Sequence, residues 1–561
     1  MTKDMTTGAI TPLLVKFTIP LVLGNLFQLT YNAADSIIVG KFVGEDALAA
    51  VGTSNPLMTL AILFINGLCL GAGILVSTAY GAGDTQRVER QVSTTAIAGT
   101  VFSLVFSALC VLLATPLLRL MQVPEEILPI AVQYLRIVFA GLIFTFFYNF
   151  LAASLPTKST DTRNTRVTKW AALAFASQAA LYEGTYRKYH GLDNYEKYLE
   201  IAASTARQFI DESGFSLYKE GTEPYRDMFC ADNAKTTEVV LARAYNFEGL
   251  QLSHSVQFSI ANLQMGFTRR FMNHYLMADG TRFTDKQGYE TMFYTDEVKN
   301  RDPRLQQTVL CPNYIQKGET TVTANDLTAY CGYRPIKFVG TKDHDGAAKS
   351  TSDWPLMRAA EVYLNYAEAK AELGTLKQED LDISINKIRE RAKMPDLNLT
   401  DANSNPDPYL AACYPNVEQG TNKGVILEIR RERTIELVME GLRQWDLFRW
   451  KEGKQMFNHY VPYYGIYVPG VGTYDMDGDG KPDLEIYETT ATSQCDNKKK
   501  LDKDIYLSNG TSGYIIGFPK VTYGKDWKEE RDYLWPVPAD QRVLTQGILT
   551  QNPGWEDGLS Y

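Results

Sequence analysis

Cysteine patterns that hold metals or disulfides are missing from this 561-residue sequence. Its seven cysteines are scattered, no two form a C-x-x-C pair, and no histidine stands near them at ligand spacing. This odd, sparse set predicts neither a zinc site nor a disulfide scaffold, although one pair remains free to form a bridge. Basic clusters are missing too, so we expect no nucleic-acid partner.

A secretory signal is not apparent either. Met1–Thr11 is polar, and the apolar run after it is too long and is followed by further runs. No cysteine follows a short apolar stretch, so we expect no lipoprotein-type signal at this position.

Charge is sparse in one part of the chain and ordinary in the rest. Residues 1–157 carry 15 charged side chains, whereas residues 158–561 carry 106. The acidic surplus also lies almost entirely in the second part. This step predicts a membrane-spanning region, 1–157, joined to a water-soluble domain, 158–561.

Four stretches in the first region are apolar over the length of about 20 residues that a bilayer core requires. They are Leu13–Val39, Ala47–Gly83, Thr94–Leu118 and Ile137–Leu155. Four such runs in succession, joined by short polar loops, favour transmembrane helices over buried helices of a soluble protein. Basic residues follow the fourth run: Lys158, Arg163, Arg166 and Lys169. The positive-inside tendency therefore predicts that the amino terminus and this segment face the cytoplasm.

Asp35 is a carboxylate inside the first predicted span. Charge inside a bilayer is costly, so such a residue normally faces a cavity or a partner. Two interpretations stay open: an interfacial residue near the end of the span, or a proton- or cation-coupling group.

Short motifs recur along residues 8–155. They are Pro20, Tyr31–Gly40 (YNAADSIIVG), Ala47–Gly52 (ALAAVG), Gly71–Val76 (GAGILV) and Gly81–Asp84 (GAGD). This series resembles the MATE (multidrug and toxin extrusion) antiporters of the inner membrane. The resemblance implies that Asp35 belongs to a cation-coupling site. The family has twelve spans in two six-helix lobes, so the four predicted spans form a partial lobe.

The second region is predicted to be mainly α, because apolar residues recur at helical spacing after Pro156. Val167–Tyr189 and Tyr195–Asp211 predict a helix pair of the tetratricopeptide type. Ser177 lies on the expected inner face of the first helix, and Ile201 is one of the apolar residues near helical spacing in the second. Further helices are predicted over Trp354–Leu373, Leu381–Lys393 and Gly424–Trp450. Stretches rich in Pro, Gly and Asp predict long surface loops at Leu397–Pro415 and Tyr464–Asp483.

A run of mixed charge, Arg430–Arg433, lies in the last of these helices and is followed by Glu436, Glu440 and Arg443. Opposite charges three and four residues apart stabilise an exposed helix face. We therefore expect a solvated face here rather than a catalytic or nucleic-acid-binding one.

Seven motifs occur in order over about 400 residues of this second region. They are Arg166–Ala174, Asp279–Gly280, Asn300–Leu305 (NRDPRL), Glu361–Ala369 (EVYLNYAEA), Ile388–Ala392 (IRERA), Glu432–Trp450 with its EGLRQWDL, and Leu549–Trp555 (LTQNPGW). Together they resemble the RagB/SusD proteins. The resemblance implies a surface protein of the Gram-negative outer membrane that holds oligosaccharides or peptides and covers a SusC-like TonB-dependent channel. It also implies a core of tetratricopeptide-like helices with loops that build the ligand face.

Aromatic residues supply the candidate ligand site. Sugars stack their C–H faces on aromatic rings, while polar side chains bind the hydroxyls. The segment Tyr460–Tyr474 opens with the sequence YVPYYGIY, and its first four tyrosines are the candidates: Tyr460, Tyr463, Tyr464 and Tyr467. Most of the other tyrosines are expected in the core or on ordinary surface.

The sequence DMDGDGKPD at Asp475–Asp483 has the spacing of a calcium loop. The predicted ligands are the carboxylates of Asp475, Asp477, Asp479 and Asp483 with the main-chain carbonyl of Lys481. The loop is not a full EF-hand, because Ile486 stands at position 12. An acidic solvated turn is the alternative.

The sequence thus favours SusD-like binding of an oligosaccharide or other nutrient, for uptake through a SusC-like transporter. This function would be carried on a chimeric chain with a truncated MATE segment. The alternatives are a drug or cation antiporter and a glycan-cleaving enzyme. Cleavage requires two carboxylates about 5–10 Å apart across a cleft, and the sequence singles out no such pair. We therefore expect no enzymatic activity.

Overall fold

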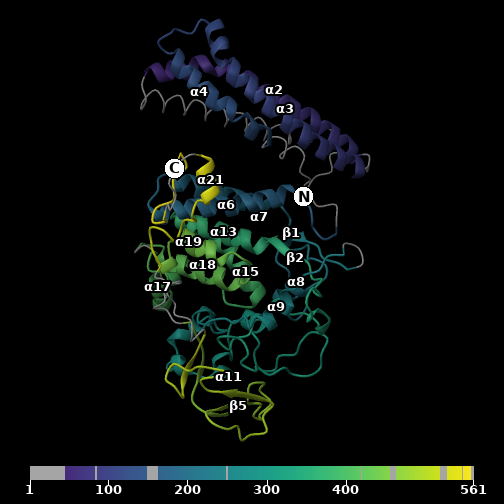
Figure 1. Ribbon diagram of the computed structural model, residues 1–561, viewed down its shortest axis with the longest axis vertical. Helices are drawn as coiled ribbons and strands as arrows, with labels where there is room; N and C mark the ends of the chain where they lie inside the picture. Colours follow the sequence, from purple (N-terminus) through teal and green to yellow (C-terminus); the bar gives the residue numbers. More distant parts are fainter. Residues whose placement is uncertain are drawn as a thin grey trace. The chain divides into compact units, whose positions relative to one another are not determined.

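The computed structural model divides into two compact units, Met1–Thr157 (unit 1) and Lys158–Tyr561 (unit 2). The structure describes residues 45–81, 85–147, 162–247, 251–417, 420–454, 463–517, 527–545 and 548–556. Helices dominate both units (Figure 1), which confirms the predicted, mainly α fold class.

The described part of unit 1 contains the apolar helices α2 (Glu45–Gly81), α3 (Thr85–Leu120) and α4 (Leu128–Ala140), and residues 142–147 are helical after a turn at Gly141. By length and composition, three stretches can cross a membrane: Ala49–Cys69, Arg90–Leu120 and Leu128–Phe147. The second and third predicted spans are therefore confirmed. The first predicted span, with Asp35, lies outside the described residues.

The fourth predicted span begins earlier than expected. The helix starts at Leu128 rather than at Ile137 and carries Arg136 within it. The predicted span began at Ile137, directly after this charged residue. The long Arg136 side chain is exposed and donates to Thr115 Oγ1 at 3.4 Å. A flexible basic side chain can extend its charge away from the apolar part of a helix in this way.

The helices of unit 1 contact one another through small residues and leave large apolar residues outside. A Cβ at Gly99 would lie 2.2 Å from the Phe146 ring, so only glycine permits this approach. Leu112 and Phe144 are 74% and 76% exposed. An apolar exterior of this kind is typical of helices whose solvent is lipid.

Unit 2 is built on the predicted helix pair, α6 (Lys169–His190) and α7 (Tyr195–Glu212), with α13 (Ala359–Glu372) packed against both. Ser177 is fully buried on the predicted inner face. The two helices approach closely at Gly184, where a Cβ would meet Leu199 at 2.8 Å. Ile201, one of the apolar residues near helical spacing in α7, is 39% exposed.

The single helix predicted over Gly424–Trp450 is two helices, α18 (Lys423–Glu436) and α19 (Arg443–Arg449). The break falls where Met439 and Gly441 adopt positive φ values of 62° and 83°. Left-handed residues end a helix, and glycine adopts this conformation without strain.

Other predicted boundaries also shift. Trp354–Leu373 begins as strand β2 (Trp354–Arg358) before α13, and Leu381–Lys393 contains the end of α14 (Gln378–Asp382) and α15 (Ile385–Ala392). The predicted loop 397–415 contains α16 (Leu399–Ser404) and α17 (Pro408–Cys413). The remaining helices are α8 (Pro224–Cys230), α9 (Val256–Asn262), α10 (Arg269–Met272), α11 (Tyr294–Glu297), α12 (Pro303–Thr308), α21 (Ala539–Leu544) and the 3-10 turns η1 (Phe283–Asp285), η2 (Tyr289–Thr291) and η3 (Lys342–His344).

The described residues of unit 2 also form three small sheets. Strand β1 (Val239–Arg243) pairs antiparallel with β2, and β3 (Tyr464–Val468) pairs antiparallel with β7 (Gly513–Ile516). In the third sheet β5 (Leu484–Tyr487) lies between antiparallel β4 (Gly472–Tyr474) and parallel β6 (Asn497–Lys500). The segment 464–483, predicted as a loop, therefore contains two strands.

The charged run of α18 is buried, so the prediction of a solvated helix face is wrong. Its members are at most 3% exposed: Arg430, Arg431, Glu432, Arg433 and Glu436. Buried charges persist only when they are paired and hydrogen-bonded. Arg431 has a partner within α18, Glu428 at 3.1 Å. Most of the other partners come from elements outside this helix, which the spacing within one helix does not reveal.

Glu436 is the centre of this buried charge. Its carboxylate pairs with Arg304 (3.2 Å) on α12, Arg358 (2.6 Å) at the end of β2, and Arg391 on α15. We call these four residues the Glu436 cluster. Burial alone would raise the pKa of Glu436, but the three guanidinium groups hold it well below its usual range. One carboxylate thereby joins three elements to α18.

The substitution Glu436→Gln tests this role. We expect it to destabilise unit 2 by about 3–5 kcal/mol, because three buried arginines lose their shared counter-ion. Since the folded pKa is lowered, the contribution is present above the usual glutamate pKa and is lost as the pH falls toward the folded value. The measurement is urea unfolding of the full chain in detergent at pH 7.

Glu212→Gln is the matched control. It breaks the exposed pair Lys169–Glu212 (3.5 Å) and is expected to cost less than about 1 kcal/mol. Equal, small losses for both variants would contradict the role given to Glu436.

Candidate functional site

Two of the predicted tyrosines lie together on the sheet of β3 and β7. The ring of Tyr464 stacks on Tyr514 with centroids 4.9 Å apart, and Tyr467 meets Tyr514 edge-on at 5.6 Å. Tyr463 holds the start of β3, because its carbonyl accepts from Gly517 N at 3.0 Å. Tyr460 lies outside the described residues. The rings of Tyr464 and Tyr514 cover one another, so part of their stacking surface is already used.

Buried polar groups lie next to this tyrosine cluster. The Arg269 guanidinium lies 5.3 Å from the Tyr514 ring and pairs with Glu297 at 3.3 Å. Tyr333 donates to the same Glu297 carboxylate at 2.6 Å. Burial raises the pKa of Glu297, and Arg269 opposes that rise. The tyrosine cluster therefore lies against a buried arginine whose charge is paired with a glutamate.

A second aromatic pair opens onto a cavity that the sequence did not predict. Phe293 and Tyr474 lie with ring centroids 4.8 Å apart and planes inclined by 31°. The cavity beside them, here called the Tyr474 cavity, has a volume of about 490 Å³. Its polar lining residues are Thr295, Lys299, Gln306, Asn313, Thr473 and Asp475. Apolar rings and polar groups thus face the same space.

Local bonds fix the orientation of Tyr474. Its hydroxyl donates to Gly470 O at 2.5 Å and accepts from Gly470 N at 3.2 Å. The chain segment opposite comes from α11 and from residues 311–313, which follow α12. Figure 1 shows α11 and β5 at the same end of unit 2. Residues nearly two hundred positions apart therefore build one cavity.

The predicted calcium loop forms one wall of the Tyr474 cavity, because Asp475 and Gly478 line it. Carboxylate oxygens of Asp475, Asp477 and Asp483 lie within 4.8 Å of one another. Main-chain N–H groups orient them: Gly478 and Gly480 donate to Asp475 at 2.7 and 2.9 Å. The loop can wrap so tightly because Gly478 and Gly480 have φ values of 85° and 88°.

Asp483 is the least compensated carboxylate of the loop. Its Oδ2 accepts from Met476 N and Asp477 N at 3.0 and 2.9 Å, whereas its shielded Oδ1 has no partner in the described part of the chain. Burial raises the pKa of Asp483, and the negative charges of Asp477 and Asp475 raise it further. A cation would relieve this repulsion.

The other two predicted ligands sit differently. Asp479 lies at the exposed rim, where its carboxylate accepts from Lys481 N at 2.7 Å. Its other oxygen is 4.0 Å from Lys481 Nζ. The structure thus brings together three of the four predicted carboxylates and leaves Asp479 outside the group.

Comparisons with known proteins match different families in the two parts of the chain. Residues 257–555 match the model of the SusD family, and residues 20–165 match the MatE family. Among curated proteins, the probable multidrug resistance protein YpnP of Bacillus subtilis is 33% identical over 152 residues, 27% of this chain and 34% of that protein. A second, YoeA of the same organism, is 34% identical over 132 residues, 24% of this chain and 28% of that protein. The chain spans about a third of the length of these relatives.

Among solved structures, a SusD-like protein from Bacteroides fragilis is 20% identical, with a TM-score of 0.47 over 75% of this chain and 71% of that one. A SusD-like carbohydrate binding protein from the same species is 18% identical, with a TM-score of 0.47 over 73% of this chain and 70% of that one.

Proposed function

The chain belongs to the SusD family, and from this membership we propose that unit 2 binds an oligosaccharide, or another nutrient such as a peptide, for uptake. The proposed partner is a SusC-like TonB-dependent transporter of the outer membrane. The Tyr474 cavity is the observation that supports this function best. Its volume of about 490 Å³ lies in the range of small-molecule sites, and its rings and polar groups suit a sugar.

Binding rather than cleavage suits the chemistry of this cavity. Hydrolysis of a glycosidic bond requires a pair of carboxylates on either side of the bond. Among the described residues that line the Tyr474 cavity, Asp475 alone carries a carboxylate. We therefore propose a binding protein without catalytic activity.

Tyr474→Ala tests the site directly. Removal of the ring leaves Phe293 without its aromatic partner and removes an aromatic surface on which the sugar would stack. The loss of stacking, about 1–1.5 kcal/mol, predicts roughly tenfold weaker binding. The measurement is calorimetry on the full chain with malto-, xylo- and xyloglucan oligosaccharides. A detergent without sugar headgroups avoids competition.

Trp535→Ala is the control, because Trp535 is an aromatic residue that is 65% exposed and does not line the cavity. Its affinity should equal that of the unmodified chain. If Tyr474→Ala binds every oligosaccharide as tightly as Trp535→Ala does, the cavity is not the site.

We also propose that the loop Asp475–Asp483 binds calcium. Oxygen ligands on a tight loop suit this hard cation, and the clustered carboxylates with the unpaired Asp483 Oδ1 support it. Calcium at 100 times its dissociation constant should stabilise unit 2 by about 2.7 kcal/mol, which appears as a higher melting temperature. The measurement is thermal melting with calcium or with chelator.

Asp477→Asn should abolish the calcium-dependent rise in melting temperature, since it removes a charge from the group. Asp343→Asn, a change of the same type at an exposed residue outside the group, should keep it. No shift in the unmodified chain, or equal shifts in both variants, would rule the site out.

A second function is favoured by the MatE match over residues 20–165 and by the apolar helices of unit 1. These features make the chain membrane-associated. We propose that Asp35 is the cation-coupling group of an inner-membrane drug or cation antiporter activity, because a carboxylate within a span normally serves an ion pathway.

Asp35→Asn removes the only carboxylate within the predicted spans and should abolish ion-coupled efflux from proteoliposomes. Glu125→Gln, at a side chain that is 79% exposed, should leave coupling unchanged. Coupled efflux that persists in Asp35→Asn would contradict the role of Asp35.

A further inference from the structure

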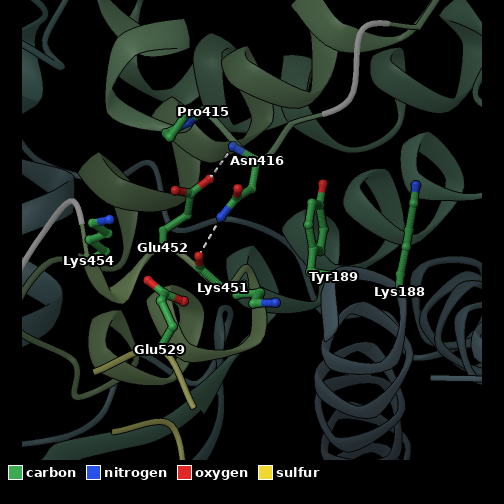
Figure 2. A pocket seen from close by; sticks show the side chains of 8 residues that line it. All are labelled: Lys188, Tyr189, Pro415, Asn416, Lys451, Glu452, Lys454 and Glu529. Atoms are coloured by element: carbon green, nitrogen blue, oxygen red, sulfur yellow. Dashed lines mark hydrogen bonds between the residues drawn. The ribbon is translucent and has the colours of Figure 1, made fainter. Parts of the chain in front are cut away.

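A second pocket of unit 2 lies apart from the Tyr474 cavity and has no part in the function proposed above. Its volume is about 390 Å³. It is formed by the end of α6, the segment after α17, the turn after α19 and one residue near the carboxyl end (Figure 2). Its lining includes Tyr189, Pro415, Asn416, Lys451, Glu452 and Lys454. We call it the Glu452 pocket.

Glu452 is buried at this pocket with half of its carboxylate unused. It is 1% exposed. Its Oε1 accepts from Asn416 N at 3.1 Å and from Arg430 Nη1 at 3.4 Å. Its Oε2 has no hydrogen-bond partner among the described residues. Figure 2 shows the carboxylate among the lining residues, with one oxygen held by Asn416. Leaving a buried acceptor unpaired is costly, so this oxygen suits a hydrogen-bond donor that arrives with a ligand.

The charges around the pocket indicate which kind of hydrogen-bond donor on the ligand fits Glu452 Oε2. Burial raises the pKa of Glu452 to about 7, although Arg430 opposes the rise. Because Arg430 already compensates the carboxylate, a neutral hydroxyl fits Oε2 better than an ammonium group does. The nearby lysines would also repel an ammonium ion.

Two lysines remain to bind an anion. Lys188 is occupied, since its Nζ donates to Glu372 Oε2 and Glu372 O, both at 2.8 Å. Within the described part of the chain, neither Lys451 nor Lys454 has an ion-pair partner, and Lys454 is exposed. Glu529 is the remaining acidic residue of the lining. Lys451 and Lys454 together carry more charge than Glu529, so the net charge of these three lining residues is positive.

The walls favour a ring-shaped ligand. Tyr189 and Pro415 give the pocket apolar surface, against which the C–H face of a sugar can pack. A volume of about 390 Å³ lies at the lower end of the range for small-molecule sites, which suits one or two sugar rings. An acidic sugar combines these three features: hydroxyl groups, a carboxylate and an apolar ring face.

From this arrangement we propose that the Glu452 pocket binds an acidic sugar of the uronic acid class. A sugar hydroxyl donates to Glu452 Oε2, carboxylates of the sugar pair with Lys451 and Lys454, which lie on different sides of Glu452 (Figure 2), and a ring packs on Tyr189 and Pro415. The inference rests on the proposed glycan binding by unit 2 and adds to it a preference for acidic sugars at a second place.

The test compares digalacturonate with neutral galactobiose by calorimetry on the full chain in a detergent without sugar headgroups. Digalacturonate should bind at least tenfold more tightly. The double variant Lys451→Met/Lys454→Met should bind it at least tenfold more weakly, and Glu452→Gln at least threefold more weakly. Lys503→Met, at an exposed lysine outside the pocket, should bind it normally.

The variants distinguish binding at the Glu452 pocket from binding at the Tyr474 cavity. Normal digalacturonate binding in Tyr474→Ala, together with loss in the lysine double variant, supports the Glu452 pocket. Loss in Tyr474→Ala with none in the double variant overturns the proposal and leaves the proposed function intact. Equal affinity for the acidic and the neutral sugar also overturns it. If no sugar binds to the unmodified chain, both proposals fail.

Discussion

The buried charge around Glu436 is the constraint on which the rest of unit 2 depends. A carboxylate taken out of water is stable only when cations surround it, and here they come from three separate elements. Arg304, Arg358 and Arg391 tie α12, the β2–α13 junction and α15 to α18. The charges also extend outward: Arg358 pairs with Glu440 at 2.8 Å, beyond the end of α18. The helical core and its connecting segments are therefore fixed by the same pairs.

Helix α12 connects these buried ion pairs to the candidate site. Arg304 anchors that helix to α18, and the chain leaves α12 directly into residues 311–313, which line the Tyr474 cavity. Asn313 N then donates to Asp477 O at 2.7 Å, which attaches the acidic loop to the same wall. A continuous series of contacts therefore connects the buried ion pair in the core to the loop. Many residues that carry the resemblance to the RagB/SusD proteins have this structural role: Asp302 and Arg304 pair at 2.6 Å, and Arg433 pairs with Asp446 at 2.9 Å.

Local patterns could be predicted from the sequence, and non-local ones could not. The helices α6 and α7 follow from apolar spacing, and the acidic loop follows from residues within one stretch of nine. The buried charge of α18 was missed because spacing along one helix describes only pairs within that helix, whereas Arg304 and Glu436 are 132 positions apart. Phe293 carried no signal in the sequence, since its partner Tyr474 lies on a distant strand. Of the predicted tyrosines, Tyr464 and Tyr467 lie beside Tyr514, a residue that the loop motif did not include.

We propose that unit 2 binds an oligosaccharide between α11 and the acidic loop. Hydrogen–deuterium exchange of the full chain, with and without the tightest-binding oligosaccharide, tests this claim most directly. Loops that line a binding site exchange more slowly when a ligand orders them. We expect protection of peptides covering residues 293–299, 311–313 and 473–478. Protection confined to other parts of the chain, with these three segments unchanged, would contradict it.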